Sequence, residues 1–237
     1  MDEVRQFRRA LTKAAAGAAG AAETARQLAG GVRVIVLVEG ESDRVALDTL
    51  AARHGRDLEA EGVAVVPLGG ATNIGRFLDV CGPPGLGLPL AGLCDIGEER
   101  HFRRHLARVG VTPALAVGGR CLSEPADTGG TEGTRNIGDH PLEALGFYVC
   151  VADLEDELIR ALGAEGVRQV IDAQGESRPF HTFQGQPAQR ERPVEHQLRR
   201  FLGTHSGRKA LYAQALIAHL DLPRVPRPLA ALLASVG

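Results

Sequence analysis

Acidic side chains follow three apolar runs of the chain, at the points where buried strands would end. In chain order they are Glu39, Asp43, Asp95, Asp153 and Glu155. Because the carboxyl ends of parallel strands meet along one edge of a sheet, we expect these carboxylates to converge on one crevice. Clustered carboxylates repel one another unless a hard divalent cation neutralises them. The pattern therefore predicts a site for Mg²⁺ or Mn²⁺.

Each of these residues also has a simpler interpretation, because Asp and Glu at strand ends often cap the following helix. The conjunction of several acids favours a site, and the glycines that follow two of them would let a phosphate come close. Ser42 is interpreted as a helix cap, and Gly69 with Gly70 as a turn before the next helix. His101 and His105 lie among arginines without an HExxH motif, which favours a solvated basic face over a zinc pair.

The elements that would position these residues are three strand–helix units followed by a fourth strand. The apolar, β-branched runs that predict strands are residues 32–40, 63–70, 90–97 and 146–154. The segments with helical spacing of apolar residues are 42–55, 71–82, 98–110 and 155–163. This alternation predicts an α/β fold with a parallel four-stranded sheet flanked by helices.

The other segments predict how the chain divides. Residues 1–30 are alanine-rich and predict an N-terminal helical segment that precedes the main domain, residues 31–163. Residues 118–141 are rich in Gly, Thr, Asp and Pro and predict a long functional loop. Residues 164–237 are polar, helical in pattern and interrupted by prolines, which predicts a small helical C-terminal subdomain.

Composition limits the classes of function. The chain has 237 residues and a net charge of −2, so a nucleic-acid surface would have to be a local patch. Its four cysteines lack CxxC spacing, which disfavours structural zinc and a disulfide framework. No apolar stretch reaches the roughly 18 residues of a membrane span, so we expect a cytoplasmic protein without a membrane partner.

Several motifs resemble a known family. VLVEGESD, a later GG and LCDIGEE resemble the Toprim (Rossmann-like) fold of topoisomerases, primases and nucleases. Together with YVCVADLEDELIRALG and GTHSGRK, they are most similar to the Toprim half of the OLD (overcoming lysogenization defect) family of nucleases, over roughly residues 32–215. The resemblance implies two metals and a catalytic lysine. By resemblance the metal ligands are Glu39, Asp43, Asp95, Asp153 and Glu155, and the catalytic residues are Glu39 and Lys209.

The sequence departs from the family at its DxD motif. Gly97 stands where the second aspartate is expected, which removes one ligand and would weaken the second metal position, although Glu98 is a candidate substitute. We therefore expect Mn²⁺, whose geometry is more forgiving, to be preferred over Mg²⁺. The GxxxxGK[ST] motif of a P-loop is also absent, so we expect a stand-alone form without the ATPase half.

The expected function is hydrolysis of nucleic-acid phosphodiesters by an OLD-like endonuclease with a two-metal mechanism. Tyr148 and Tyr212 lie in a predicted strand and helix, so hydrolysis is favoured over transesterification through a tyrosine. Two alternatives stay open, a degenerate Toprim module that binds nucleic acid or a partner ATPase without cleavage, and hydrolysis of small phosphate esters. The expected partners are nucleic acid, with DNA favoured, a separate ATPase subunit and a second copy in a homodimer.

The C-terminal segment predicts the nucleic-acid surface. Residues 178–209 contain seven Arg or Lys residues and two acids, an excess of positive charge in a chain that is negative as a whole. Arg199, Arg200 and Arg208 are the candidate backbone contacts, since guanidinium groups bind phosphate well. Lys209 is singled out because the chain otherwise uses lysine only at Lys13. A compact ammonium can approach a developing charge at phosphorus, which supports the catalytic assignment of Lys209.

Overall fold

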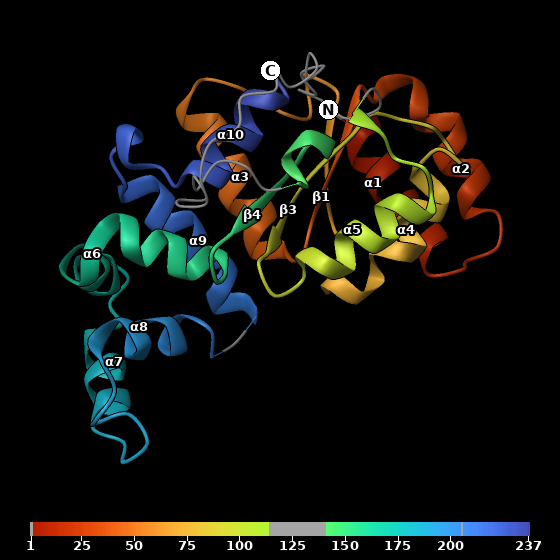
Figure 1. The fold of residues 1–237 in the computed structure, drawn as a ribbon. Coiled ribbons are helices and arrows are strands. Elements are labelled where there is room, and N and C mark those ends of the chain that lie inside the picture. Colours follow the sequence, from red (N-terminus) through yellow and green to blue (C-terminus); the bar gives the residue numbers. More distant parts are fainter. Residues whose placement is uncertain (1, 114–140, 205) are drawn as a thin grey trace, which may run out of the picture.

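The computed structural model describes residues 2–113, 141–204 and 206–237, so the loop predicted at 118–141 lies outside the described residues except for position 141. Four strands form one parallel sheet in the order β2-β1-β3-β4 (Figure 1). The strands are β1 Val34–Val38, β2 Val63–Pro67, β3 Leu90–Asp95 and β4 Phe147–Cys150. The described helices of eight or more residues are α1 Asp2–Ala15, α2 Ala21–Leu28, α3 Glu41–Arg53, α4 Ile74–Cys81, α5 Glu99–Arg108, α6 Leu154–Ala173, α7 Ser177–Gln184, α8 Val194–Leu202, α9 Ser206–His219 and α10 Arg227–Ser235.

The strands form where β-branched residues suit a backbone that is buried on both faces. Every residue of β1 is buried, and Val36 lies opposite Val65 of β2 and Ala91 of β3. β3 in turn pairs with β4. The predicted α/β fold with a parallel four-stranded sheet is confirmed, and the strands end a few residues earlier than the apolar runs because the chain there turns into the following helices.

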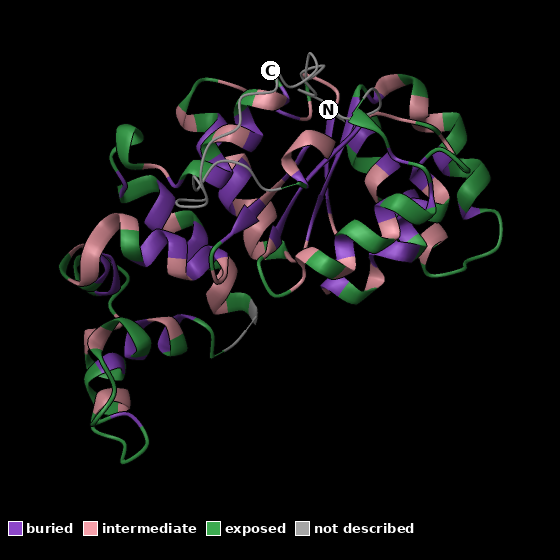
Figure 2. Ribbon diagram, viewed as in Figure 1, coloured by how far each residue is buried: buried purple, intermediate pink, exposed green. Residues whose placement is uncertain are grey.

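Side chains of β1 alternate between two cores, as expected for a strand with helices on both sides. Val34, Val36 and Val38 pack in one core with residues of α3, α6, α9 and α10. Ile35 and Leu37 pack in the other core with residues of α1, α4 and α5. Figure 2 shows the buried segments along the strands and on the inner sides of these helices. The sheet is therefore a rigid layer whose carboxyl edge can hold side chains in place.

β3 approaches its neighbours closely at Gly92. A Cβ atom at this position would lie 2.5 Å from the Phe147 ring and 2.6 Å from the carbonyl oxygen of Leu37. Only glycine fits between these groups, which lets Phe147 cross the strand and pack against Phe102 of α5. This packing sets the position of β3, the strand that ends at Asp95.

The chain leaves the sheet layers after α6. This helix bends at Gly163, where φ is 75° and ψ is 160°. Helices α7 and α8, here called the α7–α8 lobe, project away from the sheet (Figure 1). Phe180 and Phe183 pack against Phe201, with ring centroids 5.0 and 5.6 Å from that of Phe201, and these rings continue the core that includes the sheet.

The division predicted at residues 163 and 164 falls on this bend, and the segment after it is helical. However, α9 packs along α3, and α10 lies against β3 and β4. Both helices share a core with the sheet. A separate C-terminal subdomain therefore stays a proposal, because buried side chains of α7, α8, α9 and α10 all belong to the core that includes the sheet.

The structure also describes three of the cysteines and the length and polarity of the helices. The cysteines in the described part of the chain, Cys81, Cys94 and Cys150, are buried free thiols. Among the described helices none is both long and apolar enough to span a membrane.

Candidate metal and nucleic-acid site

The first two carboxylates of the site come from adjacent strands. Glu39 directly follows β1 and Asp95 ends β3, and the two strands pair in parallel. The backbone N–H of Asp95 donates a hydrogen bond to Oε1 of Glu39 at 3.0 Å. The expectation that the two strands are neighbours is therefore confirmed, and a direct contact between these residues orients the Glu39 side chain.

One cavity of about 300 Å³ at the carboxyl edge of the sheet collects the predicted site residues. Those that line it are Glu39, Asp43, Asp95, Asp153, Glu155 and Lys209. They come from the ends of β1 and β3 and from the first turns of α3, α6 and α9. The tertiary structure thus brings together residues from Glu39 to Lys209, which lie near the two ends of the segment that resembles the Toprim family.

Asp43 is held by the backbone at the start of α3. Its Oδ2 accepts a hydrogen bond from the N–H of Gly40 at 2.8 Å, and Gly40 is the N-cap of the helix. The interpretation of Ser42 as the cap is therefore wrong. The N-cap position belongs to Gly40, and the side chain that bonds back to its N–H is that of Asp43. Ser42 lines the cavity instead. The turn predicted at Gly69 and Gly70 is confirmed, with φ values of 68° and 120°.

Asp153 and Glu155 occupy different environments at the start of α6. Asp153 caps this helix through Oδ1, which accepts the N–H of Asp156 at 2.8 Å. Its Oδ2 accepts hydrogen bonds from Nε and Nη2 of Arg199 at 2.8 and 2.6 Å. Glu155 is 7% exposed, and its Oε1 lies 3.3 Å from Nζ of Lys209. Both oxygens of Asp153 are thus engaged by protein groups, whereas Glu155 faces the lysine.

The site is electrostatically strained by its own carboxylates. Burial, followed by the charges of Glu39 and Asp43, raises the pKa of Asp95 to about 8. Burial raises the pKa of Asp43 to about 7 against the effect of its hydrogen bond from Gly40. Burial likewise raises the pKa of Glu39, while the ammonium of Lys209 acts in the opposite direction. A cation bound in the cavity would favour the ionised form of all three carboxylates.

The carboxylates do not form a ready metal cage in their present rotamers. Within the described ranges, no group of three or more His, Cys, Asp or Glu side chains is arranged to hold a metal ion. The physical reason lies in the contacts above, because Asp43 and Asp153 are turned toward backbone N–H groups and Arg199. Gly97 has no atom within 4 Å of a Cβ built on it, so a side chain there would be accommodated.

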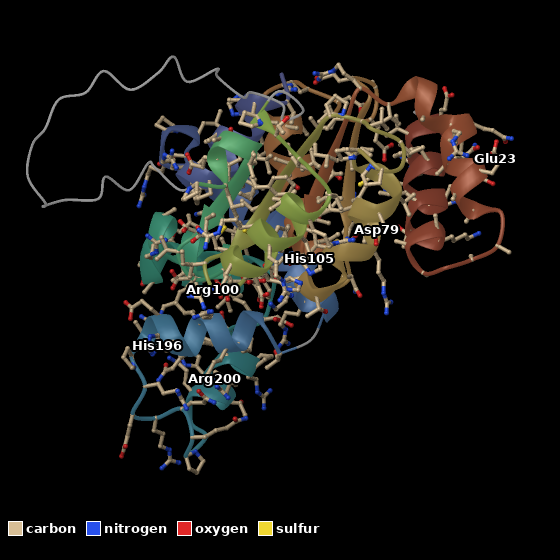
Figure 3. The ribbon with its side chains drawn as sticks, turned by 45° about the vertical axis from the view of Figure 1, so that its right-hand side comes forward. Glu23, Asp79, Arg100, His105, His196 and Arg200 are labelled. Carbon is tan, nitrogen blue, oxygen red and sulfur yellow. The ribbon has the colours of Figure 1, made fainter. Side chains whose placement is uncertain are left out.

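A basic groove adjoins the carboxylate cavity. This groove, with a volume of about 570 Å³, lies between the start of α6 and the α7–α8 lobe. It shares Asp153, Glu155 and Lys209 with the cavity and is lined on its other side by cationic or imidazole side chains of the lobe. Those side chains are Arg192, His196, Arg199 and Arg200. Figure 3 shows His196 and Arg200 on α8.

The three arginines predicted to bind nucleic acid differ in their availability. Arg200 is exposed in the groove. Arg199 lines the groove but is paired with Asp153. Arg208 donates to Oε1 of Glu176 at 2.9 Å and lies over the Phe201 ring, 4.5 Å from its centroid. Nucleic-acid binding by Arg208 stays a prediction that this internal packing does not support.

Sequence reasoning counted Arg192 only as one of the seven basic residues of segment 178–209, and it missed His196 and the contact between Arg199 and Asp153. None has a local signal, because each depends on how the lobe folds back toward α6. Tyr212 is buried in α9 with its hydroxyl donating to Glu176 at 2.9 Å, and neither tyrosine lines the carboxylate cavity.

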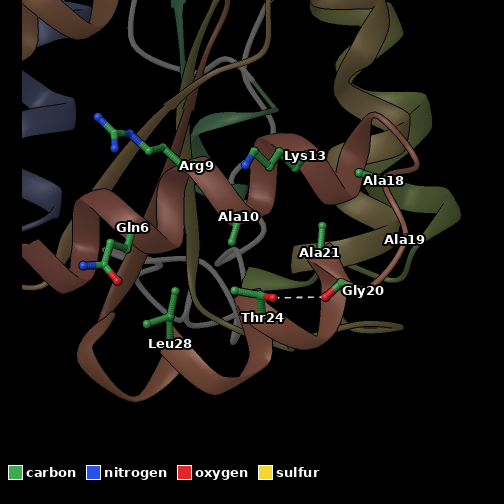
Figure 4. Close-up of a pocket in the computed structure, with 10 residues that line it drawn as sticks. All are labelled: Gln6, Arg9, Ala10, Lys13, Ala18, Ala19, Gly20, Ala21, Thr24 and Leu28. Carbon is green, nitrogen blue, oxygen red and sulfur yellow. Dashed lines mark hydrogen bonds between the residues drawn. The ribbon is translucent and has the colours of Figure 1, made fainter.

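A larger open cavity of about 690 Å³ lies elsewhere, between α1 and α2 (Figure 4). Arg9, Lys13 and Gln6 line it together with small or apolar side chains, and the Thr24 hydroxyl there donates to the carbonyl oxygen of Gly20. Its lining contains no carboxylate. Size alone therefore does not identify the chemical site of this molecule.

Known proteins match both the motif-bearing segment and the fold. The family model described as "Overcoming lysogenization defect protein-like, TOPRIM domain" matches residues 32–96, the segment that carries Glu39, Asp43 and Asp95. Over these residues the chain is similar to the OLD-like Toprim domain. No curated protein matches the chain in sequence.

Solved structures extend the likeness in fold to the C-terminal helices. The C-terminal region of the OLD protein of Xanthomonas campestris pv. campestris is 22% identical, with a TM-score of 0.57 over 86% of this chain and 94% of that one. The C-terminal region of the Burkholderia pseudomallei OLD protein is 21% identical, with a TM-score of 0.54 over 86% of this chain and 96% of that one. The chain therefore has the fold of these C-terminal regions.

Proposed function

We propose that this chain is a divalent-metal-dependent endonuclease that hydrolyses nucleic-acid phosphodiesters, with DNA as the favoured substrate. The observation that carries the proposal is the shared lining of two sites. Asp153, Glu155 and Lys209 belong both to the carboxylate cavity and to the basic groove. A polyanion bound along the groove would therefore bring a phosphodiester to the carboxylates and the lysine.

The residues of the cavity fit a hard divalent cation. Apart from Ser42 and Lys209, the polar side chains that line it are carboxylates, the ligands that Mg²⁺ and Mn²⁺ prefer. The buried Oε1 of Glu155 lies 3.3 Å from the Lys209 ammonium but accepts no hydrogen bond from any described residue, so it can also coordinate a cation. We propose Glu39, Asp95 and Glu155 as the principal ligands, with Asp43 and Asp153 available after a change of rotamer. A bound divalent ion supplies Lewis acidity and neutralises charge at the phosphodiester.

The chain's own residues would orient the substrate and stabilise charge. The Asp95 N–H fixes Glu39, so this carboxylate enters the cavity from a rigid strand end. Lys209 enters from the first turn of α9 and lies beside Glu155, where its ammonium can face a non-bridging phosphate oxygen. Arg192 and Arg200 are exposed in the groove and can bind neighbouring phosphates. Hydrolysis is favoured because no tyrosine lines the cavity.

Cleavage of supercoiled plasmid DNA tests the proposal. Purified protein is expected to nick or linearise plasmid with Mn²⁺ or Mg²⁺ and to lose that activity in EDTA. Glu39→Gln should abolish cleavage, since it removes one charge from the cavity. Glu61→Gln is the matched control, because Glu61 pairs with Arg56 next to β2 and does not line the cavity. Equal cleavage by wild type and Glu39→Gln would refute the proposed site.

A second candidate is a Toprim module that binds nucleic acid without cutting it. Gly97 removes one expected ligand, and Arg199 already neutralises Asp153, which supports this alternative. The plasmid assay separates the two candidates when binding is measured in parallel. Tight, salt-sensitive binding without metal-dependent cleavage would identify the non-cutting module.

We also propose two protein partners, a separate ATPase subunit and a second copy of this chain. The ATPase is suggested by the missing P-loop motif in a chain that is similar to the OLD-like Toprim domain. Light scattering would measure the oligomeric state. Co-expression with an ATPase from the same genome, followed by size-exclusion chromatography, would test the heterologous complex.

A further inference from the structure

Helix α5 begins beside the carboxylate cavity. It starts at Glu99, four residues after Asp95 has ended β3. Phe102 and Leu106 on one side of α5 are fully buried in the core against the sheet. The orientation of the helix is therefore fixed by packing, and the opposite side faces solvent.

That solvent side carries arginines at helical spacing. Arg100, Arg103 and Arg104 lie at i, i+3 and i+4, which places them on one face, here called the α5 arginine face. All three are exposed, and among the described residues none of them forms an ion pair with an acid. Nη2 of Arg104 lies 3.4 Å from Nδ1 of His101. In contrast, Arg108 at the far end of α5 is paired with Asp79 at 2.7 Å.

The N-terminal end of the face, at Arg100, lies on the side of α5 toward α8 in Figure 3. In Figure 3, Arg100 lies between His105 of α5 and the α8 residues His196 and Arg200. Two lining residues connect these helices to the carboxylate cavity. Asp95 lies just before α5 in the chain, and Asp153 accepts hydrogen bonds from Arg199 of α8. Two exposed groups of arginines therefore approach the same cavity from different elements.

Three like charges on adjacent turns destabilise a helix unless an anion compensates them. A guanidinium group binds phosphate oxygens through two parallel N–H bonds, and it remains charged at every physiological pH. A row of phosphates at regular spacing is the ligand that would compensate such a face.

We infer that the α5 arginine face is a second backbone-binding surface, which holds the nucleic acid on the other side of the cavity from Arg192 and Arg200. The inference rests on the proposed nuclease function and adds a subsite to it. Nucleic acid would be held on both sides of the phosphodiester at the carboxylates. Affinity should therefore rise with substrate length until both surfaces are covered.

Fluorescence anisotropy with labelled DNA duplexes of increasing length tests the inference. The triple variant Arg100→Ala, Arg103→Ala and Arg104→Ala should bind long duplexes about tenfold or more weakly, with a salt slope lower by up to about three. Short duplexes that reach only the groove should be affected little. Lysine in place of all three arginines should retain most of the affinity, because charge is kept.

A charge-matched control removes three exposed arginines elsewhere, through Arg26→Ala, Arg168→Ala and Arg224→Ala. This variant should bind long duplexes like the wild type. Equal affinity of the α5 triple variant and the control for long duplexes would overturn the inference while leaving the nuclease proposal intact. If wild-type protein binds no DNA and cleaves none, the proposed function fails and the α5 inference fails with it.

Discussion

The two sides of the candidate site are built on different principles. On the sheet side, Glu39 and Asp95 stand at the ends of buried parallel strands and are joined by a hydrogen bond from the Asp95 backbone. On the lobe side, Arg192 and Arg200 are exposed on a part of the chain that projects from the sheet and packs around Phe201. The lobe meets the carboxylate edge through the ion pair between Arg199 and Asp153.

The difference suggests that the sheet side acts in catalysis and the lobe side in binding. Burial and mutual repulsion raise the pKa values of the sheet-side carboxylates, so their geometry is maintained by the rigid sheet against an electrostatic cost. The lobe-side cations remain solvated and act on phosphates over a longer range. We therefore expect sheet-side substitutions to change turnover and lobe-side substitutions to change binding and its salt dependence.

The largest effect is expected for Lys209, which belongs to both sides. Lys209→Ala should lower the cleavage rate by a factor of ~10² or more while leaving DNA affinity nearly unchanged, because it removes one preorganised charge. Single-turnover cleavage and anisotropy measure the two quantities. Lys13→Ala is the matched control, since Lys13 lines the cavity between α1 and α2. If Lys209→Ala cleaves like the wild type, the lysine has no catalytic role.

Gly92 tests whether the sheet holds the carboxylates. Gly92→Ala should lower the free energy of unfolding by about 1–3 kcal/mol, because the new methyl group would meet Phe147 and the Leu37 backbone. Chemical denaturation measures this change. Gly30→Ala is the control, because no atom lies within 4 Å of a Cβ at that position, and it should leave the free energy of unfolding nearly unchanged. Equal stability of the two variants would show that β3 adjusts freely.

Gly97 tests the metal site directly. Gly97→Asp restores the carboxylate that the family motif would have, and the space around Gly97 accommodates it. We expect the Mg²⁺ concentration needed for half-maximal cleavage to fall about tenfold, because loss of a single group that supports a metal site weakens metal affinity by about this factor. Gly97→Asn is the control of equal size without the charge. The same metal dependence in both variants would argue against a weakened second position.

The smallest effects separate the two neighbouring arginines of α8. Arg200→Ala should reduce the salt slope of DNA binding by about one, as expected for the loss of one phosphate contact. Arg199→Ala should instead lower the free energy of unfolding by roughly 1 kcal/mol or less, because Arg199 is paired with Asp153 and partly exposed. Indistinguishable salt slopes for the two variants would mean that Arg199 also binds the backbone directly.

Much of the sheet could be predicted because its information is local. Runs such as VRVIVLV bury both faces of a strand, and acids placed directly after them must reach the carboxyl edge. That logic predicted the proximity of Glu39 and Asp95, which the pairing of β1 with β3 confirms. The cap of α3 was assigned to Ser42 instead of Gly40 with Asp43, because a shift of one residue in the helix start changes which side chain reaches the backbone.

The sequence by itself determined the parallel α/β sheet and the acids at the ends of its strands, since both follow from residue type and spacing along one segment. It also singled out Lys209, because lysine otherwise occurs only at Lys13. Only the tertiary structure decided which charges meet. It placed Arg199 on Asp153, Arg208 on Glu176 and Lys209 beside Glu155. Side chains more than thirty positions apart have no shared periodicity, and their contact depends on how α8 and α9 pack against α6, α3 and the sheet.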